Sequence, residues 1–196
     1  MGRLLGVLAA GLVACGPSAT PAKTAGAASL DATNLTAPQG TTLAQACTPS
    51  GPEQCFNAID DNCNGVIDEG CGTQTGLMQL TIAWSASTAD VNLTLTTPAK
   101  EHLNKDNRST ASGFHLDRDC PSADGCNGQN TENVYFDGID PPKGHYSVEI
   151  TLLDLHGADP PVHVRFGGRL GARSVGFDVD LGTGDDAKKT FGFDVQ

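Results

Sequence analysis

The stretch HYSVEITLLDL, from His145 to Leu155, decides the fold of this 196-residue chain. Its apolar side chains alternate strictly with polar ones, so that Tyr146, Val148, Ile150 and Leu152 are separated by Ser147, Glu149 and Thr151. Because successive side chains of a β-strand point to opposite faces, a period of two places all the apolar groups on one side. The stretch therefore predicts a long β-strand with one apolar face.

The same alternation recurs on both sides of this stretch. Five further runs have apolar residues at alternate positions: Leu80–Trp84, Val91–Leu95, Val162–Phe166, Val175–Leu181 and Phe191–Val195. Turn sequences such as DGIDPPKG, HGADPP and GTGDD separate the runs, and none of the runs has helical periodicity. About eight strands in roughly 120 residues predict an all-β fold, a two-sheet antiparallel, jelly-roll-like sandwich over residues 77–196.

A small cysteine-rich module, residues 47–72, precedes the predicted sandwich. Cys47, Cys55, Cys63 and Cys71 follow one another at a constant interval of eight. This spacing is unlike the close pairs of a zinc site, and cysteines of exported proteins usually form disulfides. Several pairings are open, and we expect the nested one, Cys55–Cys63 inside Cys47–Cys71. Two further cysteines, Cys120 and Cys126, are near enough in sequence to close a small loop.

Oxygen-bearing side chains inside this module have the spacing of a cation-binding loop. The pattern resembles the first nine positions of an EF-hand-type loop, in which alternate residues curl around one ion and a glycine makes the turn. The predicted calcium ligands are Asp60, Asn62, Asn64, the carbonyl of Val66, Asp68 and Glu69. Because Cys71 stands where such a loop ends in a bidentate Glu, Asp61, Glu69 or Glu53 would have to complete the shell. The alternative is an Asx-rich turn that only solvates a disulfide knot.

The first residues predict export. MGRLLGVLAAGLVAC has Arg3, then an apolar run from Leu4 to Ala14, and then Cys15. The run is shorter than the ~20 residues of a membrane-spanning helix, and it has the layout of a signal peptide. Leu12 to Cys15 resemble a bacterial lipobox, which implies cleavage after residue 14 and acylation of Cys15. The resemblance to Gram-negative lipoproteins favours the outer membrane.

Residues 15–46 predict a flexible tether between the lipid and the folded part. Ala, Thr, Ser, Pro and Gly dominate this segment, which carries only scattered leucines. Such a composition buries too little apolar surface to offset the entropy of ordering the backbone.

Cysteine number and charge agree with export and limit the possible partners. The chain has seven cysteines, so acylation of Cys15 leaves an even set for disulfides. The full chain has a formal charge of −11, and loss of Arg3 with the signal makes it −12. This charge repels nucleic acid and suits either divalent cations or simple solubility. We therefore exclude nucleic acid as a partner.

The stretch PEQCFNAIDDNCNGVIDEGCG, Pro52–Gly72, also resembles the motif of the MopE-like metal-binding family. That family implies metal binding, for which copper and calcium are both proposed. The stretch contains no His or Met, and an oxygen-rich ligand set favours calcium over copper.

A second resemblance covers roughly residues 77–166. The segments ADVNLTLTTP, SGFHLDRD, ENVYF and PPKGHYSVEI occur in the order of matching segments in YfaP-like β-sandwich domains of exported bacterial proteins. The resemblance implies a jelly-roll-like sandwich and a structural calcium site near Asp90, Asp117, Asp119, Glu132 and Asn133. Asn92 stands where the family usually has a second Asp. The alternative is that Asp90 and Asn133 only cap strand ends and turns.

The sequence contains no recognisable catalytic motif. None of the five histidines follows a pattern that places it beside a nucleophilic Ser or Cys, and HExxH and phosphate-loop motifs are absent. We expect a non-enzymatic outer-membrane or cell-surface lipoprotein, stabilised by one or two calcium ions, that binds a glycan or protein ligand. The alternatives are a structural component of the envelope or an accessory protein to an exported hydrolase.

Overall fold

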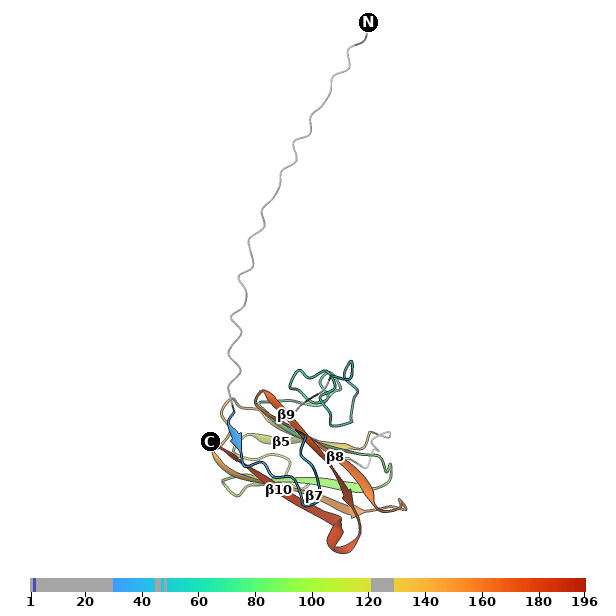
Figure 1. Ribbon diagram of the computed structural model, residues 1–196. Helices are drawn as coiled ribbons and strands as arrows, with labels where there is room; N and C mark the ends of the chain where they lie inside the picture. Colours follow the sequence, from blue (N-terminus) through green and yellow to red (C-terminus); the bar gives the residue numbers. More distant parts are fainter. Residues whose placement is uncertain (1, 3–29, 45–46, 48, 121–128) are drawn as a thin grey trace.

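The computed structural model describes residues 2, 30–44, 47, 49–120 and 129–196. Two antiparallel sheets of five strands each pack face to face, as Figure 1 shows. The predicted all-β, two-sheet sandwich is therefore confirmed. The position of Cys15 and the predicted signal peptide, apart from residue 2, lie outside the described residues.

The first sheet has the strand order β1-β10-β7-β3-β4. Its strands are β1 (Ala32–Thr33), β10 (Lys188–Val195), β7 (Gly144–Asp154), β3 (Asp90–Thr96) and β4 (His102–Leu103). Strand β7 contains the alternating stretch, and it pairs with β10 on one side and β3 on the other. The apolar face of β7 is buried, because Tyr146, Val148 and Ile150 have no exposed surface.

The second sheet has the order β5-β6-β2-β8-β9. Its strands are β5 (Phe114–Arg118), β6 (Thr131–Phe136), β2 (Met78–Trp84), β8 (Val162–Leu170) and β9 (Arg173–Leu181), and a short 3-10 helix, η1 (Gly184–Ala187), precedes β10. All seven residues of β2 are buried. The first sheet covers one face of β2, and the cysteine-rich module covers the other.

Aromatic rings hold the two sheets together in the core. Phe166 of β8 and Phe177 of β9 stack at 4.8 Å between ring centroids, and Phe191 of β10 meets both edge-on. Tyr146 of β7 stacks on Phe193 of β10 at 5.1 Å and meets Phe114 of β5 edge-on. Because each group joins strands of both sheets, the aromatic residues fix how the sheets face each other.

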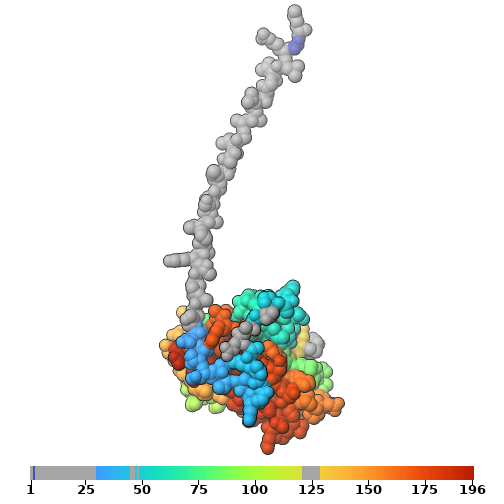
Figure 2. All heavy atoms as spheres, in the orientation of Figure 1, coloured from blue at the N-terminus to red at the C-terminus, as the bar shows by residue number. Residues whose placement is uncertain are grey.

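Residues 30–44, which we call the N-terminal strap, correct the predicted tether over part of its length. Strand β1 pairs with β10 in the first sheet, and Ala44 forms a β-bridge with Gly176 of β9 in the second. Leu30, Leu35 and Leu43 pack against the core. The strap lies on the sandwich surface as the blue segment of Figure 2. Free strand edges supply the backbone partners that this polar composition does not supply for itself. For residues 15–29 the tether stays a prediction.

The disulfide pairing also differs from the prediction. Cys47 pairs with Cys63 and Cys55 with Cys71, so the two bridges interleave instead of nesting. The physical reason lies at Asp68, whose carboxylate accepts hydrogen bonds from the amides of Asn57 and Ala58. This contact brings the turn after Cys55 against the residues just before Cys71. Cys120 is also disulfide-bonded, and its predicted partner Cys126 lies outside the described residues.

Candidate metal site

The cysteine-rich module docks on the outer face of the second sheet, as its teal ribbon shows in Figure 1. Ala58 and Ile67 are buried in this contact. The carbonyl of Ile67 accepts a hydrogen bond of 3.0 Å from the Gln79 side chain of β2. A Cβ on Gly167 of β8 would stand 2.2 Å from the carbonyl oxygen of Ala58, so only glycine fits there. The module and the sandwich therefore share a close, partly polar interface.

Asp68 organises the part of the module nearest the sheet. It is fully buried, and its carboxylate accepts from the backbone amides of Asn57 at 3.2 Å and Ala58 at 3.3 Å. Burial raises the pKa of Asp68. The guanidinium of Arg118 lies 4.3 Å from the ring centroid of Phe56, next to this turn. Both carboxylate oxygens of Asp68 therefore accept from the backbone amides of residues 57 and 58. They do not face Asn62 and Asn64, whose side chains donate to Glu69.

Asp60 and the two asparagines curl the loop between the disulfides. The carboxylate of Asp60 accepts from the amides of Asn64 at 3.0 Å and Gly65 at 2.9 Å. The side-chain oxygen of Asn62 accepts from the amide of Asn64, and that of Asn64 accepts from the amide of Val66. These are Asx-type turn contacts, and they agree with the sharp turn predicted at Gly65.

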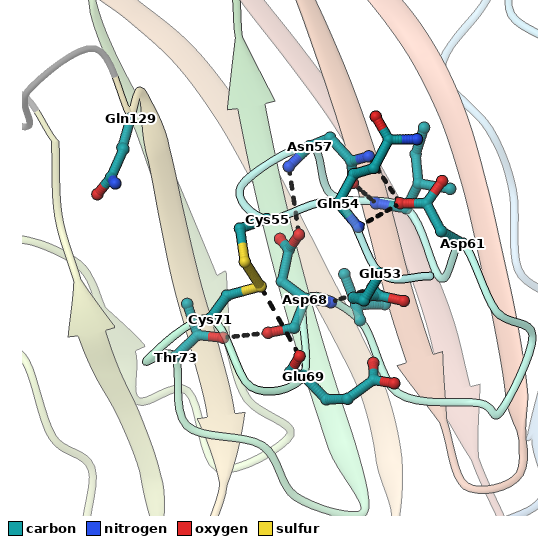
Figure 3. The surroundings of a disulfide bond; sticks show 12 residues. Glu53, Gln54, Cys55, Asn57, Asp61, Asp68, Glu69, Cys71, Thr73 and Gln129 are labelled. Carbon is teal, nitrogen blue, oxygen red and sulfur yellow. Dashed lines mark hydrogen bonds between the residues drawn. A yellow bond between two sulfur atoms is a disulfide. The ribbon is translucent and has the colours of Figure 1, made fainter. Parts of the chain in front are cut away.

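Four side chains of the module converge on one point, which we call the Glu53–Glu69 cluster: Glu53, Asn62, Asn64 and Glu69. The amide groups of Asn62 and Asn64 both donate to Oε1 of Glu69, the second at 2.5 Å. Oε2 of Glu69 is buried without a hydrogen-bond partner, and so is Oε2 of Glu53. Oε1 of Glu53 accepts from the amide of Asp68 at 2.9 Å. Figure 3 shows Glu53, Asp68 and Glu69 beside the Cys55–Cys71 disulfide.

The Glu53–Glu69 cluster is electrostatically unfavourable as it stands. Burial, together with the nearby charge of Glu69, raises the pKa of Glu53 to about 7. A buried carboxylate oxygen without a partner costs about 1–3 kcal/mol or more. Hard cations coordinate carboxylate oxygens of this kind, whereas Asn62 and Asn64 turn their NH₂ groups towards Glu69 and their oxygens towards backbone amides. Calcium binding at this cluster stays a prediction.

The sequence prediction named Glu53 only as one of three residues that would have to complete the shell. The disulfide pairing explains why Glu53 meets Glu69. Each glutamate stands two positions before a cysteine, and Cys55 and Cys71 are bonded to each other. Under the nested pairing that we expected, this meeting was not foreseeable.

The Glu53–Glu69 cluster is not a complete metal centre by its acidic groups alone. Among the described residues, no group of three or more His, Cys, Asp and Glu side chains is arranged to hold a metal ion. The Glu53–Glu69 cluster has two carboxylates and two amides, so its fit to a cation depends on the asparagines as much as on the acids.

The five residues implied by the YfaP-like resemblance do not form one group. Asn133 of β6 and Asp117 of β5 face outwards, where the Asn133 amide donates to Asp117 at 2.6 Å. Gln79 and Thr81 of β2 donate to the side-chain oxygen of Asn133 at 3.0 Å and 2.7 Å. Asp117 also accepts from the backbone amide of Gln74 at 2.8 Å. These two residues connect the linker after the module to the sheet.

Glu132, Asp90 and Asp119 lie apart from that network. Because side chains alternate along β6, Glu132 points inwards between the sheets where Asn133 points outwards. Glu132 is 1 % exposed, and burial raises its pKa well above the usual range. The charges of Asp119 and Asp90 act in the same direction. The five expected residues are thus divided between the two faces of β6.

One histidine of the sandwich has a serine and an aspartate as neighbours. The imidazole of His115 contacts Ser109 through Nδ1 and Asp137 through Nε2, both at 3.1 Å. Ser109 and His115 are opposite each other in a β-bridge, so strand pairing accounts for their contact. The side chains of His115 and Asp137 are 30 % and 55 % exposed, where water competes with both hydrogen bonds. The absence of catalysis stays a prediction.

Comparison of the chain with family models, with curated proteins and with solved structures gave no match. The MopE-like and YfaP-like resemblances therefore stay predictions. Within the ranges that the structure describes, no helix has the length and apolar character needed to cross a membrane.

Proposed function

We propose that this protein is an exported, non-catalytic binding module whose cysteine-rich loop is stabilised by calcium and whose Cys15 carries a lipid anchor in the outer membrane. The observation that carries the proposal is the pair of buried, unpartnered oxygens of Glu53 and Glu69. A divalent cation between them turns a repulsive pair into a crosslink. On the scale of extracellular modules, we expect a Kd of roughly 10⁻⁴–10⁻³ M.

A groove beside the module supports the binding role. It has a volume of about 430 Å³ and lies between the module and the outer face of the second sheet. Phe56 and Asn57 line it from the module, and His163 and Arg165 line it from the sheet. A mixture of aromatic and hydrogen-bonding groups suits a glycan or a polar protein loop. Calcium acts on this groove through the position of residues 56 and 57.

The location at the cell envelope rests on the sequence and on the disulfides. Cys47–Cys63 and Cys55–Cys71 bridges favour an oxidising compartment. Fatty chains on Cys15 would make attachment long-lived, because each buried CH₂ contributes ~0.8 kcal/mol. A structural envelope component or an accessory protein to an exported hydrolase has the same anchor, and capture of a ligand separates these alternatives from the binding role.

Calcium binding is tested on the exported chain with Cys15→Ser, which stays soluble. Calcium at ten times its Kd stabilises the folded state by about 1.4 kcal/mol. We therefore expect the melting temperature to rise by roughly 3–6 °C relative to chelator. Amide exchange over residues 59–66 is expected to slow in the same titration.

The Glu69→Gln variant is expected to lose the slowing of exchange over residues 59–66. The control Glu149→Gln removes a carboxylate that pairs with Lys188 within the first sheet, far from the module in the fold. This control is expected to keep the slowing. Unchanged exchange in the parent protein would overturn the proposal. Mass measurement of the wild-type protein tests the anchor separately, since acylation adds the mass of the fatty chains to Cys15.

A further inference from the structure

The floor of the groove beside the module carries two ion pairs. Arg165 of β8 pairs with Asp178 of β9, and His163 pairs with Asp180 directly across the same two strands. Because residues two apart on a strand share a face, both pairs lie on the outer face of the second sheet. All four side chains line the groove. The floor therefore holds two acids against two bases, and this balance favours an uncharged ligand.

The ion pair of Arg165 and Asp178 keeps hydrogen-bonding groups for a ligand. Arg165 donates from Nη1 to Asp178 at 2.8 Å. A guanidinium has five N–H groups and a carboxylate accepts several hydrogen bonds, so one such contact saturates neither group. The side chain of Asp178 is 74 % exposed, so a ligand can reach it. Neighbouring hydroxyls of a sugar ring lie about one hydrogen-bond length apart, so one can accept from Arg165 while the next donates to Asp178.

Phe56 of the module forms an aromatic wall above this floor. Its backbone has φ of +65°, a left-handed conformation that bulky residues seldom adopt and that is concentrated at functional sites. The guanidinium of Arg118 lies 4.3 Å from the ring centroid. Arg118 is not among the residues that line the groove, whereas Phe56 is. Arg118 therefore covers one side of the ring, and the remainder of this half-buried ring borders the groove.

The floor offers side chains and not main-chain groups. Strand β8 is paired with β2 on one side and with β9 on the other. A peptide that binds as an added strand needs a free sheet edge, which the middle of this sheet does not provide. Ala83 of β2, opposite Arg165, adds only a methyl group and leaves room in front of Phe56. A ligand rich in hydroxyls therefore fits this floor better than an extended peptide.

We propose that the groove binds an uncharged glycan, with the apolar face of a sugar ring on Phe56 and neighbouring hydroxyls on Arg165 and Asp178. The C–H groups of a sugar suit the negative face of an aromatic ring. The pair of His163 and Asp180 extends the site along the strands. The proposal rests on the binding role proposed above, and it narrows the ligand from a glycan or a protein loop to a neutral glycan.

The test measures binding of the exported Cys15→Ser chain to an array of neutral, sialylated and sulfated oligosaccharides. We expect the chain to bind neutral glycans, and calorimetry with the neutral glycan of highest signal then gives the Kd. Binding to sialylated or sulfated glycans alone, or to no glycan at all, would overturn the proposal. Capture of peptides from a random library, without capture of a neutral glycan, would also overturn it.

Variants of the wall and the floor locate the bound glycan. Phe56→Ala is expected to weaken binding roughly tenfold, whereas Phe56→Tyr keeps the ring and is expected to bind like the parent. Asp178→Ala removes an exposed carboxylate to which folding is less sensitive, and it is also expected to weaken binding roughly tenfold. The matched control Asp186→Ala removes an exposed carboxylate that pairs with Lys189 on the first sheet, and it is expected to leave the Kd unchanged.

Equal affinity in the parent, Phe56→Ala and Asp178→Ala would place the glycan elsewhere and overturn the proposal. Calcium binding and acylation are measured without any glycan, so the two proposals fail separately. A chain that is stabilised by calcium but binds no neutral glycan rejects the glycan site alone. A chain that binds a neutral glycan through Phe56 but shows unchanged exchange in calcium rejects the calcium site alone.

Discussion

The carbonyl oxygen of Ala58 lies directly above Gly167, so that a Cβ at position 167 would stand 2.2 Å from it. This contact joins the turn after Cys55 to β8, and both atoms at the contact belong to the main chain. The neighbouring Ile67 side chain would stand 3.1 Å from the same Cβ. The nearest neighbour is backbone, which cannot move aside as the end of a side chain can, so the docking of the module depends on the absence of a side chain at position 167.

Replacing Gly167 with Ala should lift the module from the second sheet. Overpacking of this kind costs about 1–3 kcal/mol, and here the backbone of residue 58 has to move. We expect a lower melting temperature and faster proteolysis within residues 56–66, while the near-UV signal of the aromatic core persists. Circular dichroism and timed proteolysis measure these effects.

The control for this variant is Gly157→Ala, in which the glycine has φ of +89° and nothing within 4 Å of the added Cβ. It is expected to cost about 1 kcal/mol through backbone strain and to leave proteolysis of the module unchanged. Equal proteolysis of the two variants would show that the Ala58–Gly167 contact does not hold the module.

Strand β2 shows how much of the fold could be predicted from the sequence. The alternation of Leu80, Ile82 and Trp84 predicted a strand with one apolar face, and the structure confirms it. The pattern did not predict that Gln79 and Thr81 on the other face would be fully buried. Polar residues at alternate positions are typical of a solvent-exposed face, and only the docked module turns that face into an interior.

The N-terminal strap offers a prediction about the boundary of the folded part. A chain that starts at residue 30 keeps β1 on β10 and is expected to melt like the full chain. A chain that starts at residue 45 loses the packing of Leu30, Leu35 and Leu43. We expect a loss of ~2–5 kcal/mol, since a fully buried leucine contributes roughly 1.5–3 kcal/mol and these are partly buried.

Removing the strap also exposes the edges of β10 and β9. The unpaired backbone groups of such edges can pair with strands of other chains. Light scattering is expected to show concentration-dependent aggregation of the chain that starts at residue 45. If both truncated chains melt together and stay monomeric, the strap contributes nothing to the sandwich. The sequence did not reveal the strap because its order comes from edges more than 130 residues away, as in the pairing of Ala32 with Val195.

The sequence predicted which types of side chain form the candidate site, but not which residues come together there. The oxygen-rich spacing from Asp60 to Asp68 correctly indicated a tightly curled loop, as the hydrogen bonds of Asp60 show. The same spacing does not say whether a carboxylate faces an ion or a backbone amide. Asp68 accepts hydrogen bonds from the amides of Asn57 and Ala58. Glu53 stands seven residues before Asp60, where the predicted loop begins, and it joins the site through a disulfide that the spacing does not specify.

Glu101 makes stability depend on pH in a defined direction. Its carboxylate accepts from the hydroxyl and amide of Ser112 and from the hydroxyl of Thr97. The hydrogen bond from the Ser112 hydroxyl is the main cause that lowers the pKa of Glu101 below its ordinary value of 4.5. A lowered pKa stabilises the fold above the unfolded pKa, and this stability is lost as the pH falls through the folded value.

The Glu101→Gln variant should therefore be less stable than the parent at neutral pH, by a few tenths to about 1 kcal/mol. The difference is expected to shrink as the pH falls below 4.5, the ordinary value for this group. Urea unfolding at several pH values measures it. The Ser112→Ala variant removes the main donor and is expected to reproduce the profile. A difference that stays constant down to acidic pH would contradict this role of Glu101.

Asn133 distinguishes a hydrogen-bonding role from a cation-binding one. It has no exposed surface, its amide donates to Asp117 at 2.6 Å and to the Gln74 carbonyl at 2.8 Å, and its oxygen accepts from Gln79 and Thr81. Asn133→Asp replaces both donated hydrogen bonds with repulsion between oxygens. We expect a loss on the order of 3–5 kcal/mol, because a buried charge is placed beside the carboxylate of Asp117 without a cation to pair with it.

Calcium decides between the two roles, because a ligand position behaves in the opposite way. If Asp117 and Asn133 held an ion, the added carboxylate would tighten calcium binding and raise the melting temperature in calcium above that in chelator. The hydrogen-bond network instead predicts that Asn133→Asp melts low in both. Adding Asp117→Asn to this variant puts a donor opposite the new carboxylate and restores one hydrogen bond with its direction reversed. The double variant should therefore recover part of the lost stability, again without calcium, and a failure to recover would show that the pair is not held together by that hydrogen bond.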